Sequence, residues 1–510
     1  MKVLLMYPDR DFDADAALPD NEPELTADLG LGALLEAMSA GDPFLLSVAA
    51  HGLHAGLAEP ADITYRQHVL TDSAAQPAVV RDLYDLAAET VDAERKISGF
   101  LFGDSPETVL DRSRQLMEVQ LASLRRLVGT ARREAANFRS EGFTRLFAML
   151  AAELDEAYLA EVQGRLGELE FRHGMLISAR LGTGNKGTGY VLGRQPASGW
   201  RDLLPGHGRA GYSFTVAAQD EAGSRALAEL ASRGVSDTAN AVAQATEHVR
   251  GFFAQLRAEL GFCVSCLNLR DRLLATGMPV CYPVPSDTGG NRLAARGLYD
   301  AGLALAASGH VTGNDLAADG KRLVMITGAN QGGKSTFLRA IGQAQLMMQA
   351  GMFAAAESLA ASSCSGVFTH FKREEDAAME QGKLDEELHR MSVITARIMA
   401  GGLLLCNESF ASTNEREGSE IARQLILALT EAGIRIIFVT HLYDLAESCY
   451  RDNAGKALFL RAQREPDGSR TFRLAEGEPL PTSYGEDLFR KVLGPANEEA
   501  PSEEDTWTST

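Results

Sequence analysis

The stretch from Leu323 to Thr336 constrains the fold of this chain more than any other. The apolar run Leu323–Thr327 leads directly into the pattern Gly-x4-Gly-Lys-Ser, which starts at Gly328. Between a strand and a helix this pattern is a phosphate-binding loop, because its glycines let backbone N–H groups surround an anion at the positive end of the helix. We therefore expect a buried strand, a loop and a helix that begins near Ser335. The competing interpretation is a glycine-rich turn that binds nothing.

The lysine and the serine of this loop predict a nucleoside triphosphate and Mg²⁺ as ligands. Lys334 is expected to reach the β- and γ-phosphates, and the Ser335 hydroxyl is expected to bind Mg²⁺. The expected nucleotide contacts are Gly328, Ala329, Asn330, Gln331, Gly332, Gly333, Lys334, Ser335 and Thr336.

Two apolar runs further along the chain also end in polar residues. Leu403 to Asn407 precedes Glu408, and Ile434 to Val439 precedes Thr440 and His441. If both are buried parallel strands, their carboxyl ends face the same ligand. Glu408 would then orient or deprotonate the attacking water, and His441 would sense the γ-phosphate. An ordinary strand-end histidine is the other interpretation of His441.

An asparagine, Asn407, stands before Glu408, where an aspartate usually holds the hydration shell of Mg²⁺. An amide oxygen accepts a hydrogen bond from metal-bound water but adds no charge. The attraction between unit charges about 4 Å apart runs from roughly 1 kcal/mol in water to roughly 4 kcal/mol at an intermediate dielectric. We expect Ser335, Asn407 and Glu408 to bind Mg²⁺, and hydrolysis to be slow and to need much Mg²⁺.

With these residues in place, the chain resembles the MutS family of DNA mismatch-repair ATPases. The segments that carry the resemblance are Thr327–Thr336, Asn407–Asn414, Phe438–His441, Ser483–Gly485 and Asn314-Asp315. The resemblance implies an α/β P-loop NTPase domain of the ABC type that hydrolyses ATP with Mg²⁺, and it implies Glu408, Lys334 and His441 as catalytic residues. It also implies a homodimer with composite nucleotide sites, with DNA as the partner.

Three departures from the family pattern narrow these implications. No Phe-x-Glu, the family's mismatch-reading wedge, occurs anywhere in the chain, so direct mismatch reading is not expected. The loop that reaches the neighbouring subunit's nucleotide corresponds to Glu380–Glu387, which keeps Gly382 and Lys383 but lacks the family's hydroxyl residues. The chain stops soon after Ser483–Gly485, which suggests a short MutS-related protein without a mismatch-reading N-terminal domain.

Composition sets the size and the compartment that we expect. With 510 residues, 45% of them hydrophobic, the chain predicts two or three domains. No apolar run reaches about 18 residues, so we expect a cytoplasmic protein without a membrane segment. Six cysteines do not make a disulfide scaffold. Cys263, Cys266 and Cys281 have a loose metal-ligand spacing, but buried thiols are the favoured interpretation over zinc.

Charge argues against a simple DNA-binding protein. The net charge of −20 repels phosphate, so any contact with nucleic acid must be local. The candidate is a helical stretch in which Phe138 and Phe143 are interleaved with Arg125, Arg126, Arg132, Arg133, Arg139 and Arg145. Such a stripe would track phosphates with a steep salt dependence. A solvated helix face is the slightly favoured alternative.

The pattern along the chain divides it into four ranges. They are a mostly helical domain at 1–175, a helical lever with a small β-hairpin element at 176–289, a P-loop ATPase domain at 290–492 and a disordered acidic tail at 493–510. Within these ranges we expect a short strand followed by an acidic turn at 2–13, a strand at 212–216, and helices at 82–97, 105–127 and 239–260.

Two functions from different classes fit the sequence. The first is a homodimeric, Mg²⁺-dependent ATPase whose nucleotide state opens or closes a helical clamp on irregular DNA in DNA repair. The second is a nucleotide-gated protein-interaction or ribosome-associated switch without DNA specificity. The arginine stripe favours the first, whereas the acidic charge and the missing wedge favour the second.

Overall fold

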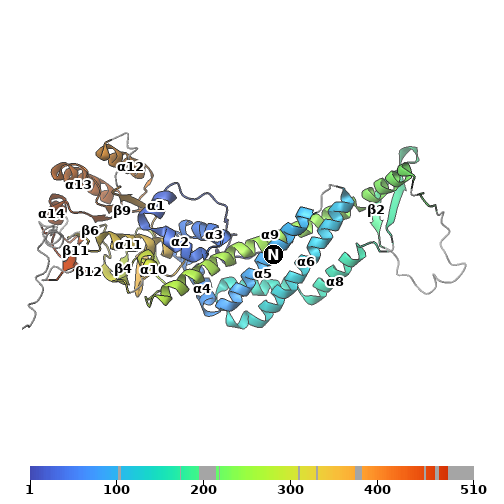
Figure 1. Ribbon diagram of the computed structural model, residues 1–510, viewed down its shortest axis with the longest axis horizontal. Coiled ribbons are helices and arrows are strands. Elements are labelled where there is room, and N and C mark those ends of the chain that lie inside the picture. The colour runs from blue at the N-terminus through green and yellow to red at the C-terminus, as the bar shows by residue number, and fades with distance from the viewer. Residues whose placement is uncertain are drawn as a thin grey trace, which may run out of the picture. The chain divides into compact units, whose positions relative to one another are not determined.

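The computed structural model groups the chain into two compact units (Figure 1). It describes residues 1–100, 105–172, 174–194, 214–217, 219–307, 310–328, 331–373, 382–452, 455–465 and 470–480. Unit 1 consists of Met1–Asp13 and His68–Val264, and unit 2 of Ala14–Gln67 and Ser265–Thr510. In the described ranges no helix is long and apolar enough to cross a membrane. The four sequence ranges remain a prediction, because compactness alone does not test whether each range is a domain.

Unit 2 is built on a six-stranded sheet whose order is β12-β11-β6-β10-β9-β8. The strands are β6 (Leu323–Thr327), β8 (Val367–Phe371), β9 (Leu403–Asn407), β10 (Arg435–Val439), β11 (Ala457–Arg464) and β12 (Arg470–Glu476). All neighbours are parallel except β11 and β12, which are antiparallel. The predicted strands around the phosphate loop are therefore confirmed, and every residue of β6 and β10 is buried, as expected of central parallel strands.

Helices cover both faces of this sheet. Leu404 and Ile436 belong to a buried cluster with residues of α12 (Lys383–Arg397), α13 (Glu415–Glu431) and α14 (Tyr443–Asp452). The alternate residues point to the other face, where α11 (Lys334–Gln349) packs. There Gly342 of α11 comes so close to Leu405 that an added Cβ would lie 2.8 Å from its side chain.

A second sheet and further helices complete unit 2. The sheet has the order β3-β7-β4-β5 and was not foreseen; it comprises β3 (Val284–Ser286), β4 (Leu293–Leu298), β5 (Asn314–Ala317) and β7 (Ser358–Ser362). The helices are α1 (Glu22–Leu29), α2 (Leu31–Ser39), α3 (Pro43–His54) and α10 (Ala301–Ala306). Gln343 of α11 donates to the Leu29 carbonyl, which ties these early helices to the phosphate-loop helix.

Unit 1 is mostly helical, as predicted. Its helices are α5 (Pro77–Phe100), α6 (Pro106–Glu134), α7 (Glu141–Glu153), α8 (Glu156–Glu168) and most of α9 (Glu221–Ala275), while α4 (Pro60–Ala75) has residues in both units. The predicted helices at 82–97, 105–127 and 239–260 lie within α5, α6 and α9, apart from the N-cap Ser105.

The strand predicted at the start of the chain is wrong. Residues 2–6 form no strand, and Leu4 has a φ of 57°. The buried carboxylate of Glu259 on α9 accepts the backbone N–H groups of Leu5, Met6 and Phe12. A side chain thus takes the place of a neighbouring strand as hydrogen-bond partner. Burial raises the pKa of Glu259, and these hydrogen bonds oppose the shift.

The β-hairpin predicted after residue 175 is confirmed. β1 (Leu176–Leu181) and β2 (Gly187–Gly193) pair antiparallel with an irregularity between Ser178 and Arg180. Ile177 packs against α9 where Gly234 has no side chain, since an added Cβ would lie 2.5 Å from Ile177. The strand predicted at 212–216 is wrong for Phe214–Val216, which form none, and residues 212 and 213 lie outside the described ranges.

The arginine stripe does not form one helix face. α6 ends at Glu134, and the Asp72 carboxylate accepts the backbone N–H groups of Arg139 and Ser140 just before α7 begins. Arg139 therefore lies in a connection and Arg145 on a different helix, which interrupts the seven-residue spacing.

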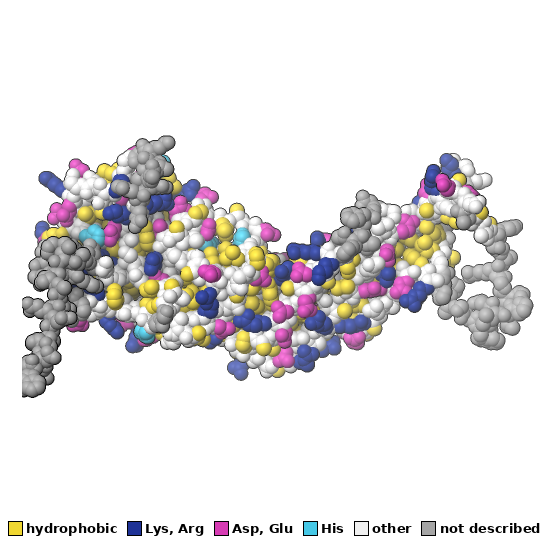
Figure 2. Space-filling model, in the orientation of Figure 1, with side chains coloured by type: hydrophobic (Ala, Val, Ile, Leu, Met, Phe, Trp, Pro, Cys, Tyr) yellow, Lys and Arg dark blue, Asp and Glu magenta, His cyan; other side chains and the backbone are white. Residues whose placement is uncertain are grey.

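The side chains of the stripe have local partners. Arg125 pairs with Glu156, and Arg126 pairs with Glu89. Phe138 and Phe143 are buried against Phe147 rather than exposed for stacking, with ring centroids 5.2 and 5.8 Å from it. Acidic and basic side chains are interspersed over these helices (Figure 2). The alternative of a solvated helix face fits better.

The cysteines favour core thiols over zinc. Cys263 and Cys266 are buried on α9 and Cys281 is partly buried. Among the described residues, no group of His, Cys, Asp and Glu is arranged to hold a metal ion.

Candidate functional site

The loop between β6 and α11 has the backbone that a phosphate-binding loop requires. Gly328 has a φ of 110°, and an added Cβ would lie 2.9 Å from the backbone nitrogen of Ala462, so only glycine fits there. Gln331 and Gly333 also have positive φ values, 59° and 86°. Gly332 is buried between them. Ala329 and Asn330, predicted to contact the nucleotide, lie outside the described residues.

Lys334 is the first residue of α11 and is buried. Its Nζ donates to the Gly328 carbonyl at 2.9 Å, so the ammonium group curls back over the loop. Burial lowers the pKa of Lys334, the nearby Glu408 carboxylate raises it, and Arg470 lowers it further. A desolvated ammonium group beside backbone amides provides strong attraction for an anion that enters the loop.

The three predicted metal-binding residues lie at the start of α11 and at the end of β9. The Ser335 hydroxyl donates to Asn407 Oδ1 at 2.8 Å, which joins the loop to the end of β9. Glu408 follows with a φ of 56°, a left-handed conformation that costs a non-glycine residue about 1–3 kcal/mol. Its backbone N–H donates to the Val439 carbonyl at the end of β10.

His441 lies directly against Glu408. Nε2 of the imidazole is 2.9 Å from Glu408 Oε2. The hydrogen bond from His441 is the largest influence on this carboxyl and holds its pKa below the ordinary value, against the opposing effect of burial. The other ring nitrogen, Nδ1, is buried and has no hydrogen-bond partner among the described residues. The carboxylate and the imidazole therefore form one polar pair at the end of β9 and β10.

Sequence reasoning missed a buried frame behind Glu408. His370, at the end of β8, has Nδ1 2.7 Å from Ser409 Oγ and Nε2 3.0 Å from the Glu387 carbonyl of α12. Ser412 donates to the Glu387 carboxylate at 2.8 Å. Burial lowers the pKa of His370 to about 4, so it stays neutral at physiological pH. These contacts link α12 to the loop that carries Glu408, and only the alternation of polar and apolar residues at strand ends hinted at them.

A cavity of about 660 Å³ opens beside these groups. Its lining includes Lys334, Ser335, Glu408 and His441, together with the apolar or aromatic residues Leu298, Tyr299, Leu303, Val311 and Phe472. Phe472 is half exposed and has a φ of 57°.

Asn314 fixes the strand that carries Phe472. Its side-chain amide donates to the Phe472 carbonyl at 3.0 Å and accepts the Leu474 N–H at 2.7 Å. This pair of bonds replaces a strand neighbour on one side of β12, and so holds it beside Gly333 of the loop, where Phe472 approaches within 3.5 Å of an added Cβ.

A β-strand, a glycine-rich loop with a buried lysine, and a helix that starts at that lysine define the class of proteins with a phosphate-binding loop. Two family models match this chain. The model of the MutS2 N-terminal domain matches residues 58–276, and the model of MutS domain V matches residues 324–497. The chain belongs to the MutS family.

Similar curated proteins share the same family name over part of their length. DNA mismatch repair protein MutS of Thermotoga sp. (strain RQ2) is 33% identical over 135 residues, which are 26% of this chain and 17% of that protein. The proteins of the same name from Thermotoga neapolitana and Chlorobium phaeobacteroides are 30% identical over 180 residues and 29% identical over 197 residues. These cover 34% and 38% of this chain and 22% and 20% of the relatives. The chain thus spans about a fifth of these relatives.

Proposed function

We propose that this chain is a MutS-like ATPase of the P-loop, ABC-type class that binds ATP with Mg²⁺, hydrolyses it slowly and couples its nucleotide state to binding of DNA in DNA repair. The observation that carries the proposal is that Lys334, Ser335, Glu408 and His441 line a single cavity, with Asn407 hydrogen-bonded to Ser335. A loop lysine, a hydroxyl, an amide oxygen, a carboxylate and an imidazole are the groups that phosphoryl transfer to water needs.

The residues present fit both ATP and Mg²⁺. The Ser335 hydroxyl and Asn407 Oδ1 are already hydrogen-bonded, and Ser335, Asn407 and Glu408 would hold the cation with their oxygen atoms or through bound water. Such an ion would neutralise phosphate charge. Lys334, freed from the Gly328 carbonyl, would bind the β- and γ-phosphates, and the loop amides would bind the remaining oxygens.

Glu408 and His441 would act on the hydrolysis step. The Glu408 carboxylate would accept a hydrogen bond from the attacking water. As the water oxygen bonds to the γ-phosphorus and the bond to the β-phosphate oxygen breaks, Glu408 would take up a water proton. His441 would turn from Glu408 to a γ-phosphate oxygen, so the pair seen here would separate when ATP is bound.

The apolar residues of the cavity lining suit the adenine base. Phe472 and Tyr299 offer aromatic surface in this lining, and Asn314 holds the Phe472 backbone in place. A base seated there would leave its phosphates directed toward Gly333 and Lys334. The dimer expected from the family would bring Gly382 and Lys383 of one copy toward the nucleotide of the other.

The contact with nucleic acid is assigned to the hairpin of unit 1 rather than to the arginine stripe. Residues 171–194 contain Arg172, Arg180, Lys186 and Arg194 and no Asp or Glu, although the whole chain carries −20. This local positive charge is visible in the sequence, but it lies on a hairpin, whereas the predicted nucleic-acid contact was a helix. Exposed Leu181 and Val191 lie on the same hairpin, and Figure 2 shows hydrophobic side chains gathered beside it.

The second candidate function is a nucleotide-gated protein switch without DNA specificity. The mixed charges over α5 and α6 and the overall acidity favour it, since neither attracts a polyanion.

ATP turnover with and without nucleic acid tests the proposal. Purified full chain is expected to hydrolyse ATP with Mg²⁺, and mismatched or branched DNA is expected to change the rate more than perfect duplex or structured RNA does. If no nucleic acid changes the rate of ATP turnover, the protein switch becomes the favoured function. A chain that retains no ATP at high Mg²⁺ would refute both functions.

A further inference from the structure

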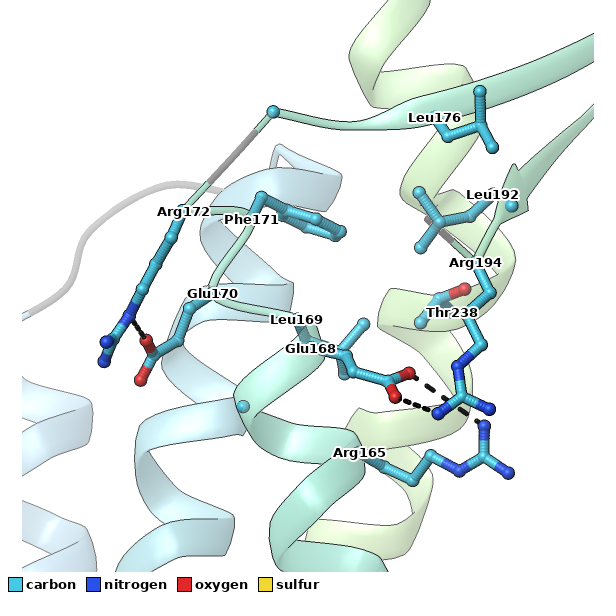
Figure 3. A pocket seen from close by; sticks show the side chains of 13 residues that line it. Arg165, Glu168, Leu169, Glu170, Phe171, Arg172, Leu176, Leu192, Arg194 and Thr238 are labelled. Atoms are coloured by element: carbon cyan, nitrogen blue, oxygen red, sulfur yellow. Dashed lines mark hydrogen bonds and ion pairs between the residues drawn. The ribbon is translucent and has the colours of Figure 1, made fainter. Parts of the chain in front are cut away.

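A second cavity, of about 1060 Å³, lies in unit 1 beside the hairpin. The end of α8, the segment that follows it, both hairpin strands and Thr238 of α9 form its walls (Figure 3). None of the groups considered for ATP lines it.

The inner surface of this cavity is apolar and aromatic. Figure 3 shows the Phe171 ring and the Leu192 side chain directed toward the same space, with Leu169 beneath them. These three side chains pack on a buried cluster of Leu110, Val235 and Ala239. Phe171 has a φ of 49°, and a bulky residue in this conformation is unusual and points to a local requirement. The ring is thus held in place by the core behind it while its free side meets the cavity.

Guanidinium groups also belong to the cavity lining. Glu168 pairs with both Arg194 and Arg165, and Glu170 pairs with Arg172. The cavity lining therefore has three arginines against two glutamates, and Arg172 and Arg194 are 75% and 68% exposed. Phosphate groups can displace such exposed or partly exposed glutamate partners, because surface ion pairs contribute little to stability.

We propose that this cavity binds one unpaired nucleobase of a nucleic-acid strand, with the base stacked on Phe171 and the flanking phosphates held by Arg172 and Arg194. A planar, apolar-faced group joined to anions on both sides matches an aromatic wall between guanidinium groups. A base inside an intact duplex cannot offer its face to the ring. This inference rests on the nucleic-acid contact of the proposed function and adds that single-stranded or extrahelical bases are the preferred ligand.

The test is fluorescence anisotropy of full chain with a short labelled single strand, with the same strand carrying abasic sites, and with a perfect duplex. The single strand is expected to bind most tightly. Phe171→Ala should weaken its binding about tenfold, as expected for the loss of one base–aromatic stack, and should leave binding of the abasic strand unchanged. Phe171→Tyr keeps the ring and should bind as the unaltered chain does.

Two controls separate a binding role from a structural one. Tyr158→Ala removes an exposed ring from α8 outside the cavity and should change nothing. 2-Aminopurine in the strand should lose fluorescence on binding, and this loss should be absent with Phe171→Ala, whatever that variant does to the melting temperature.

The outcomes distinguish this inference from the proposed function. If the chain binds nucleic acid but Phe171→Ala and abasic strands make no difference, the base-binding cavity is refuted while the proposed function stands. If no nucleic acid binds at all, the DNA part of the proposed function fails with it, and a protein partner becomes the occupant to seek.

Discussion

The cavity beside the phosphate loop and the cavity beside the hairpin hold charged groups in opposite ways. In unit 2, Lys334 is buried and Glu408 and Asn407 are fixed by hydrogen bonds to neighbouring elements. In unit 1, Arg172 and Arg194 are exposed and are paired only with exposed or partly exposed glutamates. The first cavity resembles a preorganised reaction site and the second a surface that attracts a polyanion. A single substitution should therefore change ligand binding or turnover strongly at the first cavity and only slightly at the second.

Lys334→Ala is expected to have the largest effect. Removal of the buried ammonium group should weaken ATP binding by at least about a hundredfold, since charge-assisted contacts in a desolvated site are worth roughly 2–4 kcal/mol. Isothermal titration with ATP and Mg²⁺ measures it. Lys321→Ala, which removes a partly exposed lysine of the same unit that donates to the Gly455 carbonyl, is the control. Equal affinity for both variants would contradict the assignment of the loop.

Ser409→Ala is expected to come next. It removes the hydroxyl that contacts both Nδ1 and the carbonyl of His370, and should lower kcat about tenfold with an unchanged KM for ATP, because Glu408 loses its support. The free energy of unfolding should fall by about 1–3 kcal/mol.

Ser419→Ala is the matched control for Ser409→Ala. It deletes another buried hydroxyl of unit 2, one without a hydrogen-bond partner among the described residues. If both variants lower kcat equally, the frame behind Glu408 has no specific role.

Asn407→Asp is expected to strengthen Mg²⁺ binding. A carboxylate beside Ser335 adds charge where the cation would bind, so the Mg²⁺ concentration for half-maximal turnover should fall several-fold. A Mg²⁺ titration of ATP turnover checks this, and an unchanged midpoint would discard the explanation for slow hydrolysis.

The smallest expected effect comes from Arg194→Ala in unit 1. It tests whether the exposed arginines there contribute less individually than the buried groups of unit 2. Arg194→Ala should weaken single-strand binding by only a few-fold and reduce the slope of log K against log salt by about one. Arg132→Ala, at an exposed position on α6, should leave the slope unaltered. A slope that changes with Arg132 and not with Arg194 would return the contact to the arginine stripe.

The cavity beside the phosphate loop was more predictable from sequence than the rest of the molecule because its parts are local. Apolar runs that end in Asn407-Glu408 and Thr440-His441 predict strands with polar carboxyl ends, and a parallel sheet brings those ends together. The hairpin was predictable for the same reason, since glycines between Leu181 and Tyr190 interrupt two apolar stretches.

What sequence reasoning missed depends on partners far apart in the chain. The Glu259 carboxylate accepts the N–H of Leu5, which is 254 residues away in the sequence. No local sequence pattern indicates that a carboxylate, rather than a neighbouring strand, is the hydrogen-bond partner there. The prediction of one continuous arginine-bearing helix face failed because the chain leaves the helix before α7, where the Asp72 carboxylate accepts the N–H groups of Arg139 and Ser140. His370 and Glu387 meet only because β8 and α12 pack together.

A Glu408→Gln variant tests the central claim most directly. The chain should bind ATP as tightly as before, because the loop, Lys334 and Ser335 are intact, while steady-state and single-turnover hydrolysis should fall about a hundredfold or more with the loss of the base. Glu420→Gln, an exposed carboxylate of α13, should keep full turnover. Retained hydrolysis by Glu408→Gln, or loss of ATP binding with it, would contradict the role of this carboxylate in water activation.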